Sequence, residues 1–388
     1  MSLTFDTARL PNPNLREEHQ AWREQLRRFI DAEIAPHADD WDEAGEIPID
    51  LWPKAAAVGL LGLGYPEAYG GTPADSWLSW ITQEEFARLG VGGIPASLLV
   101  HGIGLPPVIN WGSEAMKAEV APPVLAGEKW ISLGITEPGG GSDVASLTTT
   151  AVRDGDEFVV NGSKTYITGG MRASWVSTAV RTGGPGPGGV SMLLIPTDAP
   201  GFSRTPLDRK MGWWASDTAT LYFDNVRVPV DQLIGRENEG FKVIMTNFNS
   251  ERMGMAAAME AYGRVCMEEA VQWATERRTF GKRLADHQVI RHKIAMMKQK
   301  LNSTQAYIRH CFEAIEAGQP NPGDIALLKV QASEVMEFCA REAMQILGGA
   351  GYIRGNRVER IYREVRVNAI GGGSEEIMRD LAARQYGL

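Results

Sequence analysis

Apolar residues recur at helical spacing in the first and last parts of the chain. Near the N-terminus, one stripe repeats every three to four positions, at Trp22, Leu26, Phe29 and Ile30. A second stripe keeps one face over more than 20 residues, at Phe241, Ile244, Met245, Phe248, Met255, Met259 and Tyr262. Two further long helices are predicted at about 286–317 and 324–346, separated by the glycine and prolines of residues 318–322.

Residues 128–232 have a different pattern, with short β-prone runs and no sustained helical period. Ile131 to Thr136 is one apolar run, and Leu221 to Val228 is predicted to be a strand. Asp154-Gly155-Asp156 is predicted to form a turn. After it, the run 158–160 is expected to end in a tight turn at Asn161-Gly162, before a second run at 165–168.

The order helices, strands, helices predicts an α+β fold with three domains. We expect a helical domain over residues 1–127, a small β domain over 128–235 and a second helical domain over 236–388. Within the first, Gly102, Gly104, Pro106 and Pro107 interrupt the stretch 96–111. The adjacent prolines are expected to kink a helix or to begin a new turn there.

The stretch 183–189 contains a literal G-x-G-x-x-G, at Gly184, Gly186 and Gly189. Two prolines lie inside it, and strand residues rather than a helix follow. A dinucleotide-binding turn leads into a helix. The stretch is therefore interpreted as a flexible hairpin loop.

Composition narrows the function classes. A net charge of −9 and a pI near 5.4 argue against binding to nucleic-acid phosphates. The three cysteines, Cys266, Cys311 and Cys339, lack metal-ligand spacing and indicate a reducing compartment. No secretory signal is apparent at the N-terminus, and no apolar run reaches membrane-spanning length. We expect a cytoplasmic enzyme without a metal site.

Glu251 and Arg252 interrupt the apolar stripe of the helix predicted after residue 236. Adjacent residues on a helix do not face each other, so the two charges cannot simply neutralise one another. A carboxylate on a buried face has a raised pKa unless it is paired, which suits a general base. A buried ion pair with another helix is the alternative.

Two motifs resemble a known family. ITEPGGGSDV at residues 135–144 and NGSKTYITGG at 161–170 are similar to the flavin-binding signature of acyl-CoA dehydrogenases. The resemblance covers roughly residues 15–388. It implies two helical domains flanking a small β domain, with a four-helix bundle at the C-terminus, and FAD as the cofactor.

The resemblance also bears on the catalytic base. In most subfamilies a glutamate near the C-terminus, in a stretch like YEGTSQI, removes the α-proton of a thioester. The matching position here is Gly371, within AIGGGSEEI. In the isovaleryl and long-chain branches, the base instead precedes an arginine on the long helix after the β domain. Glu251-Arg252 is similar to that arrangement, so Glu251 is the expected base, with Glu375 and Glu376 as less favoured candidates.

The family resemblance assigns the remaining site residues. In the β domain the flavin contacts are Leu133, Ile135, Thr136, Gly141, Ser142, Tyr166, Ile167 and Thr168, with Tyr166 where many members have tryptophan. FAD contacts from a neighbouring subunit are implied at Arg277, Thr279, Phe280, Gln288, Gln345, Gly348, Gly349, Gly373 and Glu375, where Glu375 replaces the more usual glutamine. Substrate contacts are implied at Ser142, Asn249, Arg252, Gly371 and Gly372.

The implied activity is conversion of an acyl-CoA to its trans-2-enoyl-CoA, with an electron-transfer flavoprotein as acceptor. A shared FAD site implies a homo-oligomer, expected to be a tetramer built as a dimer of dimers. Small residues at 102, 104 and 371 predict a wide acyl pocket, suited to branched or medium-to-long chains, including isoprenoid ones such as citronellyl-CoA. Two alternatives stay open: an acyl-CoA oxidase, and a non-catalytic acyl-CoA or flavin-binding scaffold.

Overall fold

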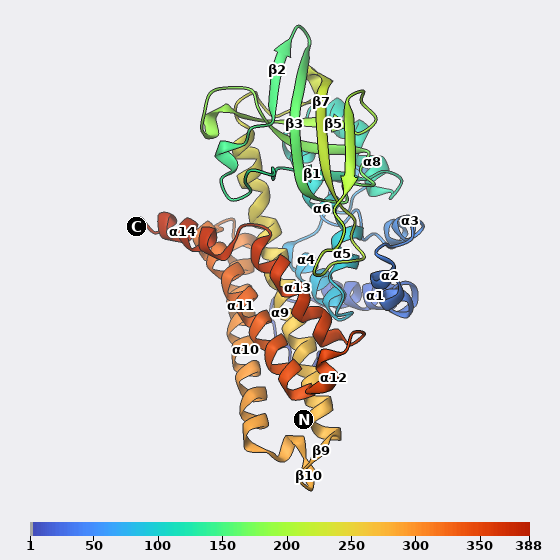
Figure 1. Cartoon of the computed structure of the whole chain (residues 1–388), viewed down its shortest axis with the longest axis vertical. Coiled ribbons are helices and arrows are strands. Elements are labelled where there is room, and N and C mark those ends of the chain that lie inside the picture. The colour runs from blue at the N-terminus through green and yellow to red at the C-terminus, as the bar shows by residue number, and fades with distance from the viewer. Residues whose placement is uncertain (1–2) are drawn as a thin grey trace. The chain divides into compact units, whose positions relative to one another are not determined.

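A computed structural model describes residues 3–388 of the chain (Figure 1). The backbone divides into two compact units. One contains the chain up to residue 40, residues 75–92 and residues 249–388, and we call it the helical unit. The other contains residues 41–74 and 93–248, and we call it the sheet unit. The predicted domain bounds, 1–127, 128–235 and 236–388, divide the same chain differently and stay a prediction.

Amphipathic helices build the helical unit, as the apolar stripes predict. It contains α1 (Glu17–Glu33), α4 (Ser76–Ala87), most of α9 (Gly240–Glu276), β9 (Arg278–Thr279), β10 (Lys282–Arg283), α10 (Gln288–Glu316), α11 (Pro322–Leu347), α12 (Gly349–Tyr352), α13 (Arg357–Ile370) and α14 (Glu375–Gln385). Helix α2 (Ala38–Ala44) crosses the boundary at residue 40. The break predicted at 318–322 separates α10 from α11, and Asn321 caps α11 by accepting from the Gly323 and Asp324 amides.

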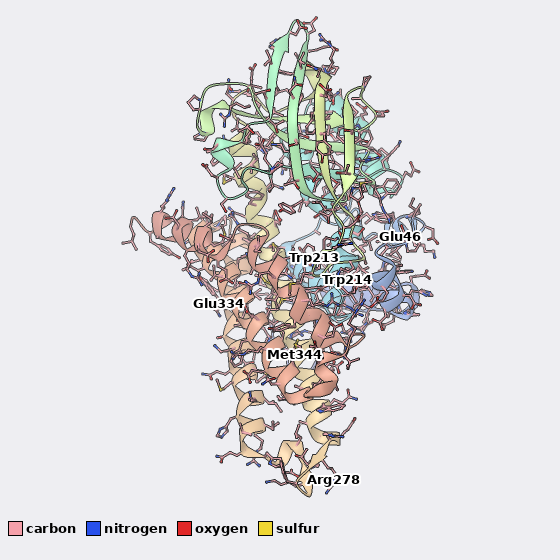
Figure 2. The ribbon with its side chains drawn as sticks, viewed as in Figure 1. Glu46, Trp213, Trp214, Arg278, Glu334 and Met344 are labelled. Carbon is pink, nitrogen blue, oxygen red and sulfur yellow. The ribbon has the colours of Figure 1, made fainter. Side chains whose placement is uncertain are left out.

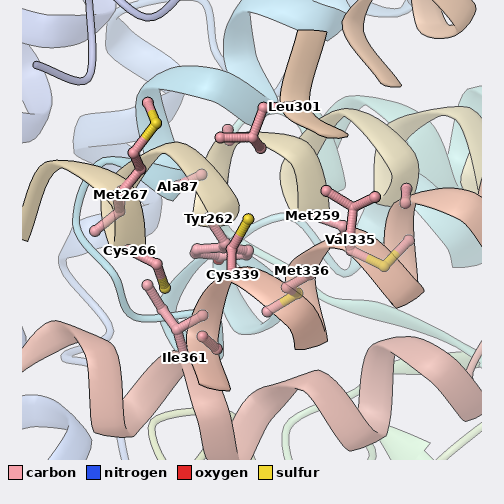
Figure 3. Packing of buried hydrophobic residues seen from close by; sticks show 14 of the residues in the cluster. Ala87, Met259, Tyr262, Cys266, Met267, Leu301, Val335, Met336, Cys339 and Ile361 are labelled. Atoms are coloured by element: carbon pink, nitrogen blue, oxygen red, sulfur yellow. The ribbon is translucent and has the colours of Figure 1, made fainter. Parts of the chain in front are cut away.

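The core of the helical unit lies between α9, α11 and their neighbours (Figure 3). Methionines, alanines and small residues dominate it, and Gly263 allows Leu301 and Cys339 to approach the α9 backbone closely. All three cysteines are buried and unpaired in this unit, at 0–3% exposure. Burial raises the pKa of Cys311 to about 12. The thiols therefore serve as packing groups.

The sheet unit is built on an eight-stranded sheet. Its strands run in the order β6-β7-β3-β2-β4-β5-β8, and β1 pairs in parallel with β4. The strands are β1 (Ile131–Gly134), β2 (Thr150–Asp154), β3 (Glu157–Thr168), β4 (Trp175–Arg181), β5 (Val190–Pro196), β6 (Phe202–Pro206), β7 (Thr218–Pro229) and β8 (Leu233–Ile234). The helices of this unit are α3 (Leu51–Ala57), α5 (Gly93–Leu98), α6 (His101–Gly104), α7 (Pro106–Trp111) and α8 (Glu114–Leu125).

The tight turn predicted at Asn161-Gly162 is wrong, because β3 runs unbroken through it. Gly162 has φ of 144°, and a Cβ there would lie 2.8 Å from Thr149 Cα. The register of β3 with β7 shifts between Val160 and Gly162. The glycine therefore allows a bulge and a close approach of two backbone segments, not a chain reversal.

Other local predictions are confirmed. Gly155, with φ of 62°, lies in the turn that joins β2 to β3. The glycine-rich stretch 183–189 connects the antiparallel strands β4 and β5, as a hairpin loop should. Pro106 begins α7, where its missing amide hydrogen costs nothing. Within residues 3–388, no helix is both long and apolar enough to cross a bilayer.

Candidate active site

Glu137 fixes the glycine-rich loop 138–147 of the sheet unit at its base. Its carboxylate accepts hydrogen bonds from the Thr148 amide at 2.7 Å, the Thr149 amide at 2.8 Å and the Lys164 ammonium at 2.8 Å. Burial alone would raise the pKa of Glu137, but the Lys164 charge and these hydrogen bonds hold it at about 2. Because Glu137 precedes the loop and Thr148 follows it, this one carboxylate joins the two ends of the loop.

The two flavin-like stretches lie side by side in the sheet unit. The Thr165 amide donates to the Thr136 carbonyl at 2.8 Å, so the segment after β1 runs beside β3. Tyr166 has φ of 60°, at a second shift in the pairing of β3 with β7, and its side chain is 70% exposed. The bulge therefore turns this aromatic ring away from the core.

The other residues of these stretches differ in what they can offer a ligand. The side chains of Ile135 and Ile167 are buried in the core, which leaves only their backbone groups for contact. The remaining members are half-buried or exposed: Leu133, Thr136, Gly141, Ser142 and Thr168.

Glu251 lies in α9 of the helical unit, and its carboxylate is covered. Its Oε2 atom has no hydrogen-bond partner among the described residues. Burial raises the pKa of Glu251 to about 7, against the opposing charges of Arg252 and Lys329. An uncompensated carboxylate of this kind accepts a proton near neutral pH, as a general base should.

The loop between α13 and α14 is held by cations from two other helices. Arg252 donates from Nε to the Gly372 carbonyl at 2.9 Å, and Lys329 donates to the Gly373 carbonyl at 2.8 Å. Gly372 and Gly373 have φ of 67° and 108°, so the loop requires glycine at both positions. Gly371 has φ of −64°, which any residue can adopt. Three of the predicted substrate residues, Arg252, Gly371 and Gly372, thus meet in one place.

The predicted cross-subunit FAD residues belong to the helical unit, where most are exposed and Thr279, Gly373 and Glu375 are half-buried. Arg277 follows α9, and Thr279 and Phe280 lie in or beside the β9–β10 hairpin that also carries Arg278, labelled in Figure 2. Phe280 is 96% exposed, with φ of 51°. The others lie at the start of α10 and around the end of α11: Gln288, Gln345, Gly348 and Gly349.

Glu375 and Asn249 have defined partners. The Ser333 hydroxyl donates to the Glu375 carboxylate at 2.6 Å, which ties the start of α14 to α11. Asn249 accepts from Arg252 Nη1 at 3.3 Å. Glu376 is exposed to solvent.

Sequence reasoning missed three charged residues that hold these segments in place: Glu137, Lys164 and Lys329. Glu137 and Lys164 lie inside the quoted motifs, one in each, so a pair of opposite charges was a visible signal. Lys329 lies near the start of the predicted helix 324–346, in the apolar run 325–330, and its signal was a cation among apolar residues.

Comparison with known proteins assigns the chain to the acyl-CoA dehydrogenase family. Models of the N-terminal, middle and C-terminal domains of acyl-CoA dehydrogenase match residues 16–128, 132–226 and 238–387. The mouse mitochondrial long-chain specific acyl-CoA dehydrogenase is 34% identical over 95% of this chain and 86% of its own length. A probable acyl-CoA dehydrogenase from Mycobacterium abscessus superposes with a TM-score of 0.93 at 45% identity, covering 96% of this chain and 99% of that one.

The fold is accordingly that of an acyl-CoA dehydrogenase, with a helical N-terminal domain, a middle β domain and a helical C-terminal domain. The chain is an FAD-dependent oxidoreductase of this family. A structure of glutaryl-CoA dehydrogenase from Mycobacterium smegmatis, described as a complex with FADH2, superposes with a TM-score of 0.90 at 26% identity, over 96% of each chain.

The residues present suit this cofactor. FAD combines a flat ring system with a pyrophosphate. In the sheet unit, the exposed Tyr166 ring lies on a strand whose neighbouring segment carries the Thr136 hydroxyl, which suits the ring system. In the helical unit, the exposed Arg277, two residues before Thr279 in the chain, offers charged donors to a phosphate.

Proposed function

We propose that this acyl-CoA dehydrogenase uses Glu251 to remove the α-proton of a branched or medium-to-long acyl-CoA, forming the trans-2-enoyl-CoA, and passes its electrons to an electron-transfer flavoprotein. The FAD supplies the acceptor for the substrate's β-hydride. The observation that carries the proposal is the covered Oε2 atom of Glu251, which has no hydrogen-bond partner within residues 3–388.

Three features support this base over the C-terminal alternatives. Glu251 has a pKa of about 7, suited to proton abstraction at neutral pH. Glu375 is engaged by the Ser333 hydroxyl, and Glu376 is open to solvent. Gly371, at the position of the usual base, cannot take a proton.

The first test replaces the carboxylate without changing its shape. We expect Glu251→Gln to fold and to retain FAD but to lose about 10²–10⁴-fold in the rate of flavin reduction by acyl-CoA under anaerobic conditions. Stopped-flow absorbance of the flavin measures this rate. Glu375→Gln is the matched control and should reduce normally. The assignment fails if the control is the slow variant and Glu251→Gln is near normal.

Two outcomes would change the reaction class. Hydrogen peroxide production in the absence of an added acceptor would identify an oxidase. If wild-type flavin is not bleached by any acyl-CoA, the protein is a binding scaffold. If the reduced flavin is reoxidised only by an electron-transfer flavoprotein, this result supports the proposed acceptor.

The substrate class rests on fewer residues than the sequence indicated. A Cβ on Gly104 would lie 2.7 Å from the Ile131 carbonyl oxygen, so this glycine is required for α6 to pack on β1 and does not widen a pocket. A Cβ on Gly102 would meet nothing within 4 Å. Gly371 lies in the loop held by Arg252, which is proposed to contact the substrate. The support for a bulky or long acyl group is therefore the resemblance to the long-chain specific relative.

A panel of thioesters tests this class. We expect kcat/KM for isovaleryl-, octanoyl-, palmitoyl- or citronellyl-CoA to exceed that for butyryl-CoA. The preference should be graded, because each methylene contributes only about 1–3 kcal/mol of discrimination in an apolar pocket. A clear optimum at butyryl-CoA would contradict the proposal and leave the enzyme class unchanged.

We also propose a homotetramer located in the cytoplasm. Large apolar side chains that are 60–96% exposed on the isolated helical unit support burial against other copies: Phe280, Val289, Tyr352 and Ile353. Light scattering of the FAD-loaded protein measures the assembly, and a monomer at micromolar concentration would rule it out.

A further inference from the structure

Lys329 is a lysine buried completely within the helical unit. Its side chain is 0% exposed, and its Nζ donates to the Ala369 carbonyl and to the Gly373 carbonyl, at 2.8 Å in each case. The carbonyl between these anchors, that of Gly372, accepts from Arg252. Two cations, one from α9 and one from α11, therefore hold neighbouring carbonyls of one loop. Arg252 directly follows Glu251.

A buried ammonium needs more compensation than two neutral carbonyls provide. The carboxylates whose charges act on Lys329 are those of Glu375, Glu251 and Glu376. Glu376 is exposed and Glu375 accepts from Ser333, whereas the covered Oε2 atom of Glu251 has no hydrogen-bond partner among the described residues. Lys329 and Glu251 thus complement each other in charge without forming a direct pair.

We propose that Lys329 is a positioning residue for the base: its ammonium ties the end of α13 and the loop after it to α11, beside the Arg252 contact to the same loop, and supplies a positive charge that favours the ionised form of Glu251. The inference deepens the proposed function and rests on it. Neither the sequence pattern nor the motif resemblance assigns Lys329 a role.

The charges around Glu251 and Lys329 determine how the pKa of Glu251 should change when Lys329 is replaced. Burial raises the pKa of Glu251, and Arg252 and Lys329 are the cations that oppose this rise. Burial lowers the pKa of Lys329 to about 8, so the ammonium persists at neutral pH. Removing this charge should raise the pKa of Glu251 further. The rate of flavin reduction rises with pH as Glu251 ionises. In a Lys329 variant without the charge, this rising part of the pH–rate profile, its ascending limb, should therefore lie at higher pH.

The experiment measures anaerobic flavin reduction of the FAD-loaded enzyme by octanoyl-CoA between pH 6 and 9. We expect Lys329→Met and Lys329→Gln to shift the ascending limb upward by about 0.5–1 pH unit. Lys329→Arg keeps the charge and should keep the limb. Lys300→Met is the matched control, because it also replaces a lysine with methionine but at a different place: the Lys300 Nζ lies 5.0 Å from the Phe338 ring centre.

A purely structural role would lower the rate equally at every pH. An unchanged limb in Lys329→Gln, or a shifted limb in Lys329→Arg, overturns the inference. If Lys329→Met fails to fold, the glutamine variant, which retains an amide donor, decides the outcome, and the arginine variant provides an independent test.

The failure of the inference can be separated from failure of the proposed function. If Glu251→Gln reduces its flavin normally, Glu251 is not the base and the proposed function fails. If Glu251→Gln is inactive at every pH while the Lys329 variants keep the wild-type limb, only the role of Lys329 is wrong.

Discussion

At the scale of single residues, the C-terminal glycines have different reasons for being glycine. Gly372 and Gly373 adopt positive φ, and a Cβ on Gly373 would lie 2.4 Å from Met378 Cε. Gly371 has an ordinary backbone, and a Cβ there would lie 3.1 Å from the Val367 carbonyl oxygen. A side chain at Gly371 is therefore tight but compatible with the loop.

Because the backbone at Gly371 can accept a side chain, we predict that the catalytic base can be moved from residue 251 to residue 371. We expect the double variant Glu251→Gln with Gly371→Glu to recover part of the reduction rate that Glu251→Gln loses, because the carboxylate returns to the position used by most of the family. Anaerobic stopped-flow reduction measures the recovery. Gly372→Glu in the same background is the control and should not recover, since φ of 67° strains a side chain. Equal rates in the single and double variants would contradict the prediction.

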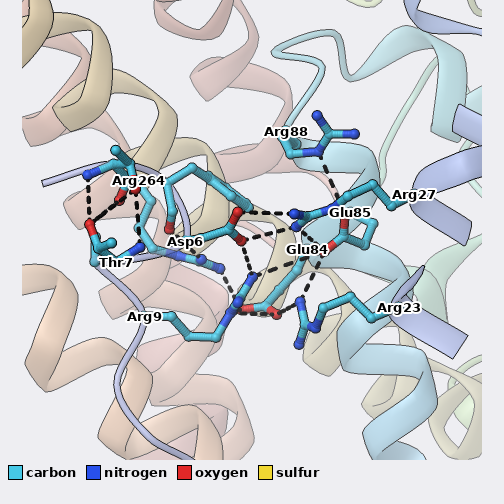
Figure 4. A network of polar contacts seen from close by, with 12 residues as sticks. Asp6, Thr7, Arg9, Arg23, Arg27, Glu84, Glu85, Arg88 and Arg264 are labelled. Atoms are coloured by element: carbon cyan, nitrogen blue, oxygen red, sulfur yellow. Dashed lines mark hydrogen bonds and ion pairs between the residues drawn. The ribbon is translucent and has the colours of Figure 1, made fainter. Parts of the chain in front are cut away.

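At the scale of elements, a buried ion network joins the N-terminal segment to α4 and α9 (Figure 4). Arg264 is 0% exposed and donates to Glu260 at 3.0 Å, to Glu84, and to the Phe5 carbonyl at 3.1 Å. Its guanidinium carbon also lies 4.3 Å from the Phe5 ring centre. Burial opposes ionisation of Glu84, but the arginines around it lower its pKa to about 2. The network holds the segment before α1 against the core.

Removing one partner of such a network leaves the others buried and unpaired. We expect Arg264→Met to lower the free energy of unfolding by about 3–5 kcal/mol. Arg227→Ala breaks exposed ion pairs with Asp154 and Glu157, and it should cost far less, because solvent screens these charges. Urea denaturation of the FAD-loaded protein, followed by circular dichroism, compares the two. Equal costs would mean that the buried network is fully replaceable by apolar packing.

The elements also show what could be predicted from the sequence. The helices predicted at about 286–317 and 324–346 agree with α10 and α11 to within about two residues, whereas the stripe from Phe241 to Tyr262 covers only the first part of α9. A buried helix face must repeat every 3.6 positions, which makes such stripes visible in the sequence. Glu251 was noticed because it broke such a stripe. The bulge at Gly162 was missed, since its cause is the approach of Thr149, and this contact does not appear in local sequence. Lys329 was missed for the same reason, because its partners lie 40 and 44 residues away.

At the scale of the whole molecule, the candidate cofactor residues are divided between the two units. Tyr166 and the glycine-rich loop belong to the sheet unit, and Arg277 and Phe280 belong to the helical unit. The resemblance implies that the second group serves the FAD of a neighbouring copy. Cofactor binding and assembly are therefore expected to depend on the same residues.

A single substitution tests this dependence. We expect Arg277→Ala to be purified with less FAD, because it removes charged donors from the pyrophosphate. The ratio of flavin to protein absorbance measures occupancy, and light scattering measures assembly. Arg278→Ala is the matched control, one residue away and also exposed. Full FAD content and normal assembly in Arg277→Ala would exclude the cross-subunit phosphate role.

Because all three thiols are buried, the folded protein should not react with thiol-alkylating reagents. Cys266, Cys311 and Cys339 are at most 3% exposed, so maleimide can reach them only when the helical unit opens. The rate of alkylation therefore measures how often the helical unit opens. A single cysteine introduced at an exposed position outside the proposed sites, such as Ile49→Cys, would be the one fast-reacting thiol on the native chain for attaching a fluorophore.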